Sequence, residues 1–232
     1  MIRIPARFLC ILALLAMSPP PPVVSGIAPP DSSPRGASYA QWSARWWRWL
    51  MQHPLAGHPS VDDPSFDVTS GQSGKVWFLA TPVSFGTTTP PALTRTITIR
   101  PGVALFVGMI NGEMSSLEGA ATEAEQRAVA NFQADRIVGL SATLDGQPVD
   151  DILDFRFESP QFTFTAPTPW VFGPTGGTGT SVADGYYLYL EPMGVGQHVL
   201  HYTGGFHFEA GVFGPEPFDI TADQTYVINV AP

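Results

Sequence analysis

Side chains that could do chemistry gather near the end of the chain, in the stretch QHVLHYTGGFHFEA. Those with an imidazole or a carboxylate are His198, His201, His207 and Glu209. Gly204-Gly205 suits the two central positions of a type I′ hairpin turn, because both positions need a positive φ that glycine adopts easily. The stretch therefore predicts a β-hairpin in which Tyr202 lies opposite His207.

Alternation of side chains along the two hairpin strands predicts a half-polar face that could bind a ligand. Its members are Tyr202, His198, His207 and Glu209. Two imidazoles and a carboxylate are enough for a transition-metal site, or for an acid and a base that titrate near neutral pH. The spacing H-E-x-x-H is absent, so exposed or structural histidines are the simpler alternative. His201 would point to the opposite face, where we expect a hydrogen-bonded core histidine.

Glu113 is a second candidate for chemistry because it closely follows the apolar run VALFVGMI. We expect Asn111-Gly112-Glu113 to form the turn that ends this strand. A carboxylate at the mouth of a sheet can act as a general base or bind a hard metal ion, although such a residue is often simply solvated. Glu113 and His207 are therefore the candidate catalytic residues.

Aspartates gather in three loops, where their oxygens could hold calcium. The groups are Asp62-Asp63 with Asp67, Asp150-Asp151 with Asp154, and Asp219 with Asp223. No D-x-D-x-D-G loop is present, so we expect no cofactor, with calcium or a transition metal as the alternative. The chain also lacks the G-x-S-x-G elbow, the phosphate loop and the dinucleotide fingerprint. Paired carboxylates of the glycosidase kind stay open, because their separation is set in three dimensions.

Glycine and proline punctuation indicates many short strands. The chain has 23 Gly and 24 Pro among 232 residues, and 44% of its residues are hydrophobic. Strands are expected at 75–81, 93–100, 103–111, 139–143, 155–158, 162–165, three across 181–210, and 225–230. Asp145-Gly146 is expected to be a turn, and 172–180 a flexible or ligand-facing loop. The pattern predicts an all-β fold, an antiparallel β-sandwich of the immunoglobulin-like or jelly-roll-like kind.

Two helices are expected to accompany the strands. Ser38 with Gln41, and Thr122 with Glu125, each have the spacing of a capping box. In the first helix an apolar stripe would cover one end of the β-core: Tyr39, Trp42, Trp46, Trp49, Leu50 and His53, with Trp47 at its margin. Membrane insertion and sugar stacking are the alternatives for this Trp-rich helix. The second helix, 122–137, is expected on the surface, and its apolar positions are Ala128, Val129, Phe132 and Ile137.

The N-terminus has the layout of a secretory signal peptide. Arg3 and Arg7 precede an apolar run of about ten residues, which is shorter than a membrane span. We expect residues 1–26 to be the signal peptide, 27–37 a Pro- and Ser-rich linker, and 38–232 a single β-sandwich domain. Cys10, the one cysteine of the chain, would leave with the signal. The prediction is a secreted protein, periplasmic or extracellular, without a later transmembrane segment.

The charge balance argues against nucleic acid as a partner. Removal of residues 1–26 would take two of the 11 Lys and Arg residues and none of the 20 acidic ones, which leaves 9 against 20, a net charge of −11. A phosphate backbone needs a basic track that such a chain lacks.

Several segments resemble known proteins. YAQWSARWWRWL, GQSGKVWFLA, PGVALFVGMIN and ADGYYLYLEPMGVGQHVLHYTGG together resemble an uncharacterised family of secreted bacterial proteins with a Y-A-x-W-S-x-R-W-W-x-W helix and a V-W-F-L-A strand. The resemblance covers most of residues 38–230 and brings no catalytic residue with it. Family members carry cysteines near the G-Q-S-G and strand positions, which this chain lacks. The run from TLDGQPV to DGYYLYLEPMGVGQH is similar to strands of immunoglobulin-like sandwiches, which bears on fold rather than function.

Together these observations favour an exported β-sandwich that serves as a binding or cell-envelope module. Its partner would be a small molecule, a glycan or an envelope protein that meets the hairpin face or the adjoining loops. The alternative is a hydrolase-type enzyme, with or without a metal, that uses Glu113 with the hairpin histidines and the aspartates of 62–67. A structural role in an assembly is a third hypothesis.

Overall fold

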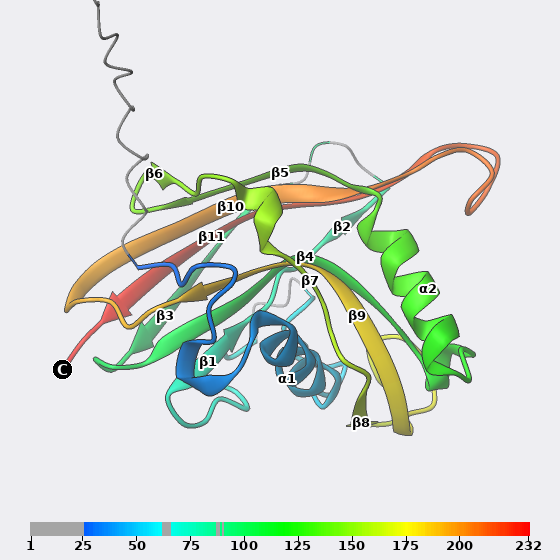
Figure 1. Ribbon diagram of the computed structural model, residues 1–232, viewed down its shortest axis with the longest axis horizontal. Coiled ribbons are helices and arrows are strands. Elements are labelled where there is room, and N and C mark those ends of the chain that lie inside the picture. The colour runs from blue at the N-terminus through cyan, green and yellow to red at the C-terminus, as the bar shows by residue number, and fades with distance from the viewer. Residues whose placement is uncertain (1–25, 62–65, 87–88, 90) are drawn as a thin grey trace, which may run out of the picture.

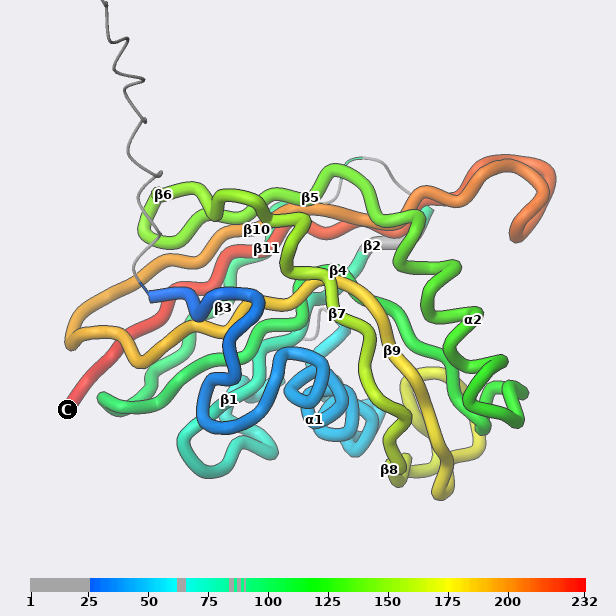
Figure 2. The backbone as a smooth tube through the Cα atoms, in the orientation of Figure 1, coloured from blue at the N-terminus to red at the C-terminus, as the bar shows by residue number. Residues whose placement is uncertain are grey.

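The computed structural model describes residues 26–61, 66–86, 89 and 91–232. Within these ranges the chain is mostly β, with one five-stranded and one six-stranded sheet and two α-helices. Figures 1 and 2 show the six-stranded sheet along the top of the view and the five-stranded sheet below it. Cys10 and all of the expected signal peptide except Gly26 lie outside the described residues.

The five-stranded sheet has the order β1-β4-β9-β7, and β8 also pairs with β9. Its strands are β1 (Val76–Leu79), β4 (Ala104–Ser115), β7 (Arg156–Glu158), β8 (Phe162–Ala166) and β9 (Gly177–Leu190). β4 and β9 form the centre of the sheet and are antiparallel. β9 begins at Gly177, so the last residues of the expected 172–180 loop belong to this strand.

The six-stranded sheet has the order β2-β11-β10-β5-β6, and β3 also pairs with β11. Its strands are β2 (Ser84–Phe85), β3 (Ala92–Ile99), β5 (Ile137–Leu144), β6 (Gln147–Pro148), β10 (Gly196–Phe208) and β11 (Phe218–Val230). The predicted Asp145-Gly146 turn joins β5 to β6, with φ of 52° and 76° at its two residues.

Both sheets are mixed, whereas a purely antiparallel arrangement was expected. β1 pairs with β4 in parallel, and β3 pairs with β11 in parallel. A parallel pair needs a long crossover connection, and the direction of a strand leaves no mark on its alternation of apolar and polar residues. The strand positions were therefore predictable, but the strand directions were not.

The predicted hairpin at Gly204-Gly205 is wrong. β10 runs through both glycines without a turn, and Gly204 and Gly205 pair with Ala222 and Thr221 of β11. Tyr202 is buried while His207 is half-buried, and their spacing of five along one strand places them on opposite faces. An added Cβ at Gly204 would lie 2.9 Å from Cγ1 of Ile110 in the other sheet. The glycine therefore permits close packing of the sheets instead of a turn.

The Trp-rich helix α1 (Tyr39–Met51) forms as predicted, and Ser38 and Gln41 complete its capping box. Its predicted stripe is buried, as is Trp47, which was expected at the margin. α1 lies against the five-stranded sheet (Figure 1). The Nε1–H group of Trp46 donates a hydrogen bond of 2.8 Å to the carbonyl of Leu79 at the end of β1.

Residues 27–37 are packed against the fold and do not form the extended linker that was expected. Ile27 makes a β-bridge with Leu190. The carbonyl of Pro34, in the 3₁₀-helix η1 (Pro34–Gly36), accepts a hydrogen bond of 3.0 Å from Trp42 Nε1. The segment therefore covers one side of the aromatic core.

The second helix α2 (Glu123–Ala134) begins at the predicted capping box of Thr122 and Glu125. Its buried residues are Gln126, Ala130 and Ala134, whereas Ala128 and Phe132, two of the expected apolar positions, are exposed. α2 packs on β4 and β9 and lies at the right of the view, below the upper sheet (Figure 1). Small side chains allow this close approach, so the buried face of α2 is not its most apolar one.

Two further 3₁₀-helices, η2 (Ser116–Glu118) and η3 (Ile152–Phe155), follow β4 and precede β7. Within the described ranges, no helix has the length and apolar character needed to cross a membrane.

Candidate functional site

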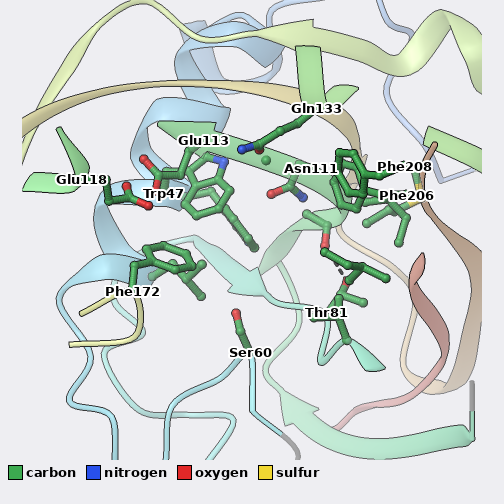
Figure 3. A pocket seen from close by; sticks show the side chains of 18 of the residues that line it. Trp47, Ser60, Thr81, Asn111, Glu113, Glu118, Gln133, Phe172, Phe206 and Phe208 are labelled. Carbon is green, nitrogen blue, oxygen red and sulfur yellow. Dashed lines mark hydrogen bonds between the residues drawn. The ribbon is translucent and has the colours of Figure 1, made fainter. Parts of the chain in front are cut away.

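A pocket with a volume of about 280 Å³ lies between α1, the C-terminal half of β4 and the inner face of β10 and β11. Its lining combines aromatic rings with a few polar groups (Figure 3). The aromatic residues are Trp46, Trp47, Phe172, Phe206, Phe208 and Phe213, and the polar ones are Ser60, Thr81, Asn111, Glu113, Glu118 and Gln133. A concave, largely apolar surface with a few convergent polar groups is typical of small-molecule sites.

A β-bulge in β4 turns Glu113 toward this pocket. The β4–β9 register shifts between Gly108 and Asn111, where β4 carries one residue more than β9. Before the bulge, Gly108 faces α1, because an added Cβ would lie 2.5 Å from the Trp46 ring. The extra residue reverses the alternation, so Asn111 and Glu113 face the α1 side as well. Glu113 therefore lies within the strand, and the expected turn at 111–113 does not exist.

The Glu113 carboxyl is only 5% exposed and has two partners. Ser181 Oγ on β9 donates a hydrogen bond of 2.5 Å to Glu113 Oε2. The carboxyl of Glu118 in η2 forms a further hydrogen bond with Glu113, and Figure 3 shows the two groups beside each other. Glu118 is exposed and accepts a 2.6 Å hydrogen bond from Ser115 Oγ. The pair thus has one buried member and one at the mouth of the pocket.

Burial raises the pKa of Glu113 well above its usual value, and the hydrogen bond and negative charge of Glu118 raise it further, against the opposing effect of the Ser181 hydrogen bond. Two carboxyl groups in contact cannot both ionise cheaply, so one proton stays between them. Glu113 therefore keeps its proton to a higher pH than a solvated glutamate does, and a positive partner would favour its carboxylate form.

Trp47 forms one wall of the pocket and is held in place by a hydrogen bond. Its Nε1–H group donates to the hydroxyl of the buried Tyr187 at 2.9 Å. The ring centroid of Trp47 lies 6.3 Å from that of Phe172. Across the pocket, the Phe208 ring contacts Phe213 edge to face at 4.8 Å. Aromatic surface thus lies on opposite sides of the cavity.

Tyr202, a predicted ligand-binding residue, lies behind the pocket wall. Its hydroxyl is 2.7 Å from Thr81 Oγ1, which also donates to the carbonyl of Gly108. Tyr202 is fully buried and does not line the cavity. Its role is to hold Thr81, which does line the cavity.

The predicted face of Tyr202, His198, His207 and Glu209 does not form. His207 lies on the outer face of β10, where its Nδ1 is 2.8 Å from Asp219 and its Nε2 is 3.5 Å from Glu209. His198 lies near the other end of β10, paired with Asp145 at 2.7 Å. Hydrogen bonds to these aspartates raise the pKa of each imidazole. Neither histidine lines the pocket. His207 is therefore not positioned to act together with Glu113.

His201, expected in the core, is half-exposed and pairs with Asp223 at 2.9 Å. Asp219 and Asp223, proposed above as calcium ligands, are thus partners of histidines on β10. Asp62-Asp63 lie outside the described residues. In the part of the chain that the structure describes, no three His, Cys, Asp or Glu side chains are arranged to hold a metal ion.

Comparisons with protein-family models, with curated proteins and with solved structures return no match. The resemblance of the Trp-rich helix and the V-W-F-L-A strand to a secreted bacterial family stays a prediction.

Glu118 and the phenylalanines of β10 were not anticipated as site residues. Glu118 is five residues after Glu113, and no local pattern links them. The signal that could have been used is the run of polar residues N-G-E-M-S-S-L-E after an apolar strand, because a strand that continues through it must turn some of them inward.

Proposed function

We propose that this chain is an exported binding module for a small, largely apolar molecule that occupies the Glu113 pocket. One observation carries the proposal: a buried carboxyl group faces a half-open cavity whose walls are largely aromatic. Apolar walls supply the free energy of binding, and a few polar groups orient the ligand. The binding function inferred from the sequence is thereby retained, but its location moves from the outer face of β10 to the pocket.

We also propose a more specific fold class for the two mixed sheets. Two layered sheets with an inner face of large side chains support a sandwich of the jelly-roll-like or immunoglobulin-like kind. The two parallel pairs, β1 with β4 and β3 with β11, are departures from the usual antiparallel form.

Binding of a neutral two-ring probe, 2-naphthol, tests the proposal by calorimetry and by quenching of tryptophan fluorescence. Ser60→Phe places a ring in the cavity and should weaken binding at least tenfold. Ser141→Phe, on exposed Ser141 of β5, adds the same ring outside the cavity and should leave binding unchanged. Absence of binding to the unaltered chain, or equal loss in both variants, would contradict the proposal.

The hydrogen-bonded carboxyl pair favours a second candidate function, acid and base catalysis. Protonated Glu113 can act as a general acid, and Glu118 at the mouth can receive a proton from water. Hydrolysis of ester, glycoside and amide panels by the purified chain tests this function. Glu113→Gln and Glu118→Gln should each abolish activity, whereas His207→Ala should retain it. An inactive wild type, or activity that survives Glu113→Gln, would end this candidate.

A further inference from the structure

The cavity around Glu113 has a charge character that narrows the class of its ligand. Its lining in the described residues contains two carboxyl groups, Glu113 and Glu118, and no Lys, Arg or His. The whole chain is acidic as well, with a net charge of −9. A ligand with a carboxylate or phosphate would find no positive partner here and would meet two acids instead. Anionic ligands are therefore disfavoured.

Aromatic faces around the cavity suit a positive group. Trp47 and Phe172 lie beside the carboxyl pair in Figure 3, and Phe206 and Phe208 lie across the cavity from it. The negative face of an aromatic ring attracts an ammonium group, and the attraction grows when water is excluded. An apolar molecule with one amine could thus place its ring against the phenylalanines and its charge against the acids.

The two carboxyl groups are oriented so that a cation can neutralise their charge and donate hydrogen bonds to them. Glu113 already accepts from Ser181 and Glu118 accepts from Ser115, so each carboxyl is oriented by a serine of the sheet. The proton that the two acids hold between them can leave to solvent when an ammonium group enters, because the ammonium then provides the positive charge and the hydrogen-bond donors. The ligand's own N–H bonds stay intact in this exchange.

We propose that the ligand of the pocket is a small organic cation, a primary or secondary ammonium attached to an apolar ring system. The inference rests on the proposed function, since it specifies the ligand of the same cavity. A volume of about 280 Å³ lies just below the usual range for ligand sites, which begins at about 300 Å³. The ligand is therefore of one or two rings, with its ammonium beside the Glu113 and Glu118 carboxyl groups.

Three probes with one ring system and different charges test the inference: 2-naphthylmethylammonium, 2-naphthylmethanol and 2-naphthoate. Calorimetry on the full chain should show the cation binding at least tenfold more tightly than the alcohol, and the naphthoate binding more weakly than either. The double variant Glu113→Gln with Glu118→Gln keeps the cavity shape and removes both acids. It should bind the cation no more tightly than the alcohol.

The outcomes distinguish failure of the cation inference from failure of the proposed binding function. If the alcohol binds and the cation binds no more tightly, the cation inference is overturned and the pocket keeps its binding function. If the double variant retains the preference for the cation, the carboxyl pair is not its source and the inference fails as well. If none of the three probes binds, the proposed function fails together with the inference.

Discussion

Ser181 Oγ donates a hydrogen bond of 2.5 Å to Glu113 Oε2 from the neighbouring strand. The two residues are diagonal neighbours on one face of the β4–β9 pair, because Ser181 is opposite Ser115 and Glu113 is opposite Ala183. The bulge between Gly108 and Asn111 brings them to the same face. A single extra residue in β4 therefore determines whether the chain has a carboxyl group in its pocket.

Glu113→Gln should change how stability depends on pH. The folded pKa of Glu113 lies above its unfolded value of 4.5, so the native state keeps a proton that the unfolded state releases. This contribution to stability is fully present below about pH 4.5 and is lost as the pH rises through the folded pKa. Glutamine does not titrate. Melting temperatures should therefore differ little near pH 4 and increasingly favour the variant toward pH 7, by about 2–4 °C for each kcal/mol.

Glu125→Gln is the matched control, since hydrogen bonds from Thr122 at the helix N-terminus lower the pKa of Glu125. Its contribution is present above the unfolded pKa and is lost on acidification, so the wild type should be favoured increasingly as the pH rises. A pH-independent difference between the wild type and Glu113→Gln would show that folding does not raise the pKa of Glu113.

His58 should destabilise the protein in mild acid. It is fully buried, its Nε2–H donates to the carbonyl of Leu50 at 3.1 Å, and its Nδ1 accepts from the backbone N–H of Ser60 at 3.2 Å. Burial lowers its pKa from 6.5 to about 4, so the unfolded chain takes up the proton first. Stability from this residue is present above pH 6.5 and should fall by about 3 kcal/mol as the pH drops toward 4.

Urea denaturation of the wild type and of His58→Gln at pH 7 and pH 4.5 measures this effect. The cost of the substitution should be smaller at the lower pH, because glutamine escapes the protonation penalty. An NMR titration in which His58 of the native protein titrates near pH 6.5 would contradict the prediction.

Gly108→Ala should destabilise the contact between α1 and β4. An added Cβ would lie 2.5 Å from the Trp46 ring and 2.9 Å from Asn111 Nδ2, so the indole would have to move out of its packed position. Overpacking of this kind costs about 1–3 kcal/mol. Gly194→Ala is the control, since no atom lies within 4 Å of its added Cβ. Chemical denaturation should show a loss for Gly108→Ala only, and equal stabilities would refute the close contact.

Arg156→Met should destabilise the fold more than Arg127→Met. Arg156 donates to both oxygens of Asp184, which is 3% exposed, and also pairs with Asp135 beyond the end of α2. Removal of Arg156 leaves a buried carboxylate without its cation, at about 2–3 kcal/mol.

The comparison works because the two arginines are similarly exposed and differ in their partners. Arg127 pairs with Glu123 and Glu158, both of which reach solvent, and such pairs contribute less than about 1 kcal/mol. Thermal unfolding of both variants tests the ranking. If Arg127→Met proved the more destabilising, burial of Asp184 would not be the controlling factor.

Local features of the fold were predictable because their causes lie within a few residues. Ser38 and Thr122 cap helices through hydrogen bonds to residues three positions away. The Asp145-Gly146 turn needs only two residues that tolerate positive φ. The apolar run 103–111 predicts a central strand because it is apolar on both faces, and β4 confirms it.

The candidate site was predictable only in part. Glu113 was identified from its place after an apolar strand, and it does lie in the pocket. His207 and Tyr202 were grouped by a turn that does not exist. A Gly-Gly pair is compatible with a hairpin turn and equally with a strand that packs closely against a second sheet. Gly204 and Gly205 alone therefore did not distinguish a turn from a continuous strand.

By itself, the sequence determined where the helices begin, where most strands lie, and that the chain is acidic and rich in β-structure. Only the tertiary structure decided which strands pair, in which direction, and on which face Glu113 and His207 fall. The physical reason is the range of the interactions. Caps and turns are hydrogen bonds between near neighbours, whereas pairings such as Glu113 with Ala183 or Phe206 with Ile220 depend on packing the whole chain at once.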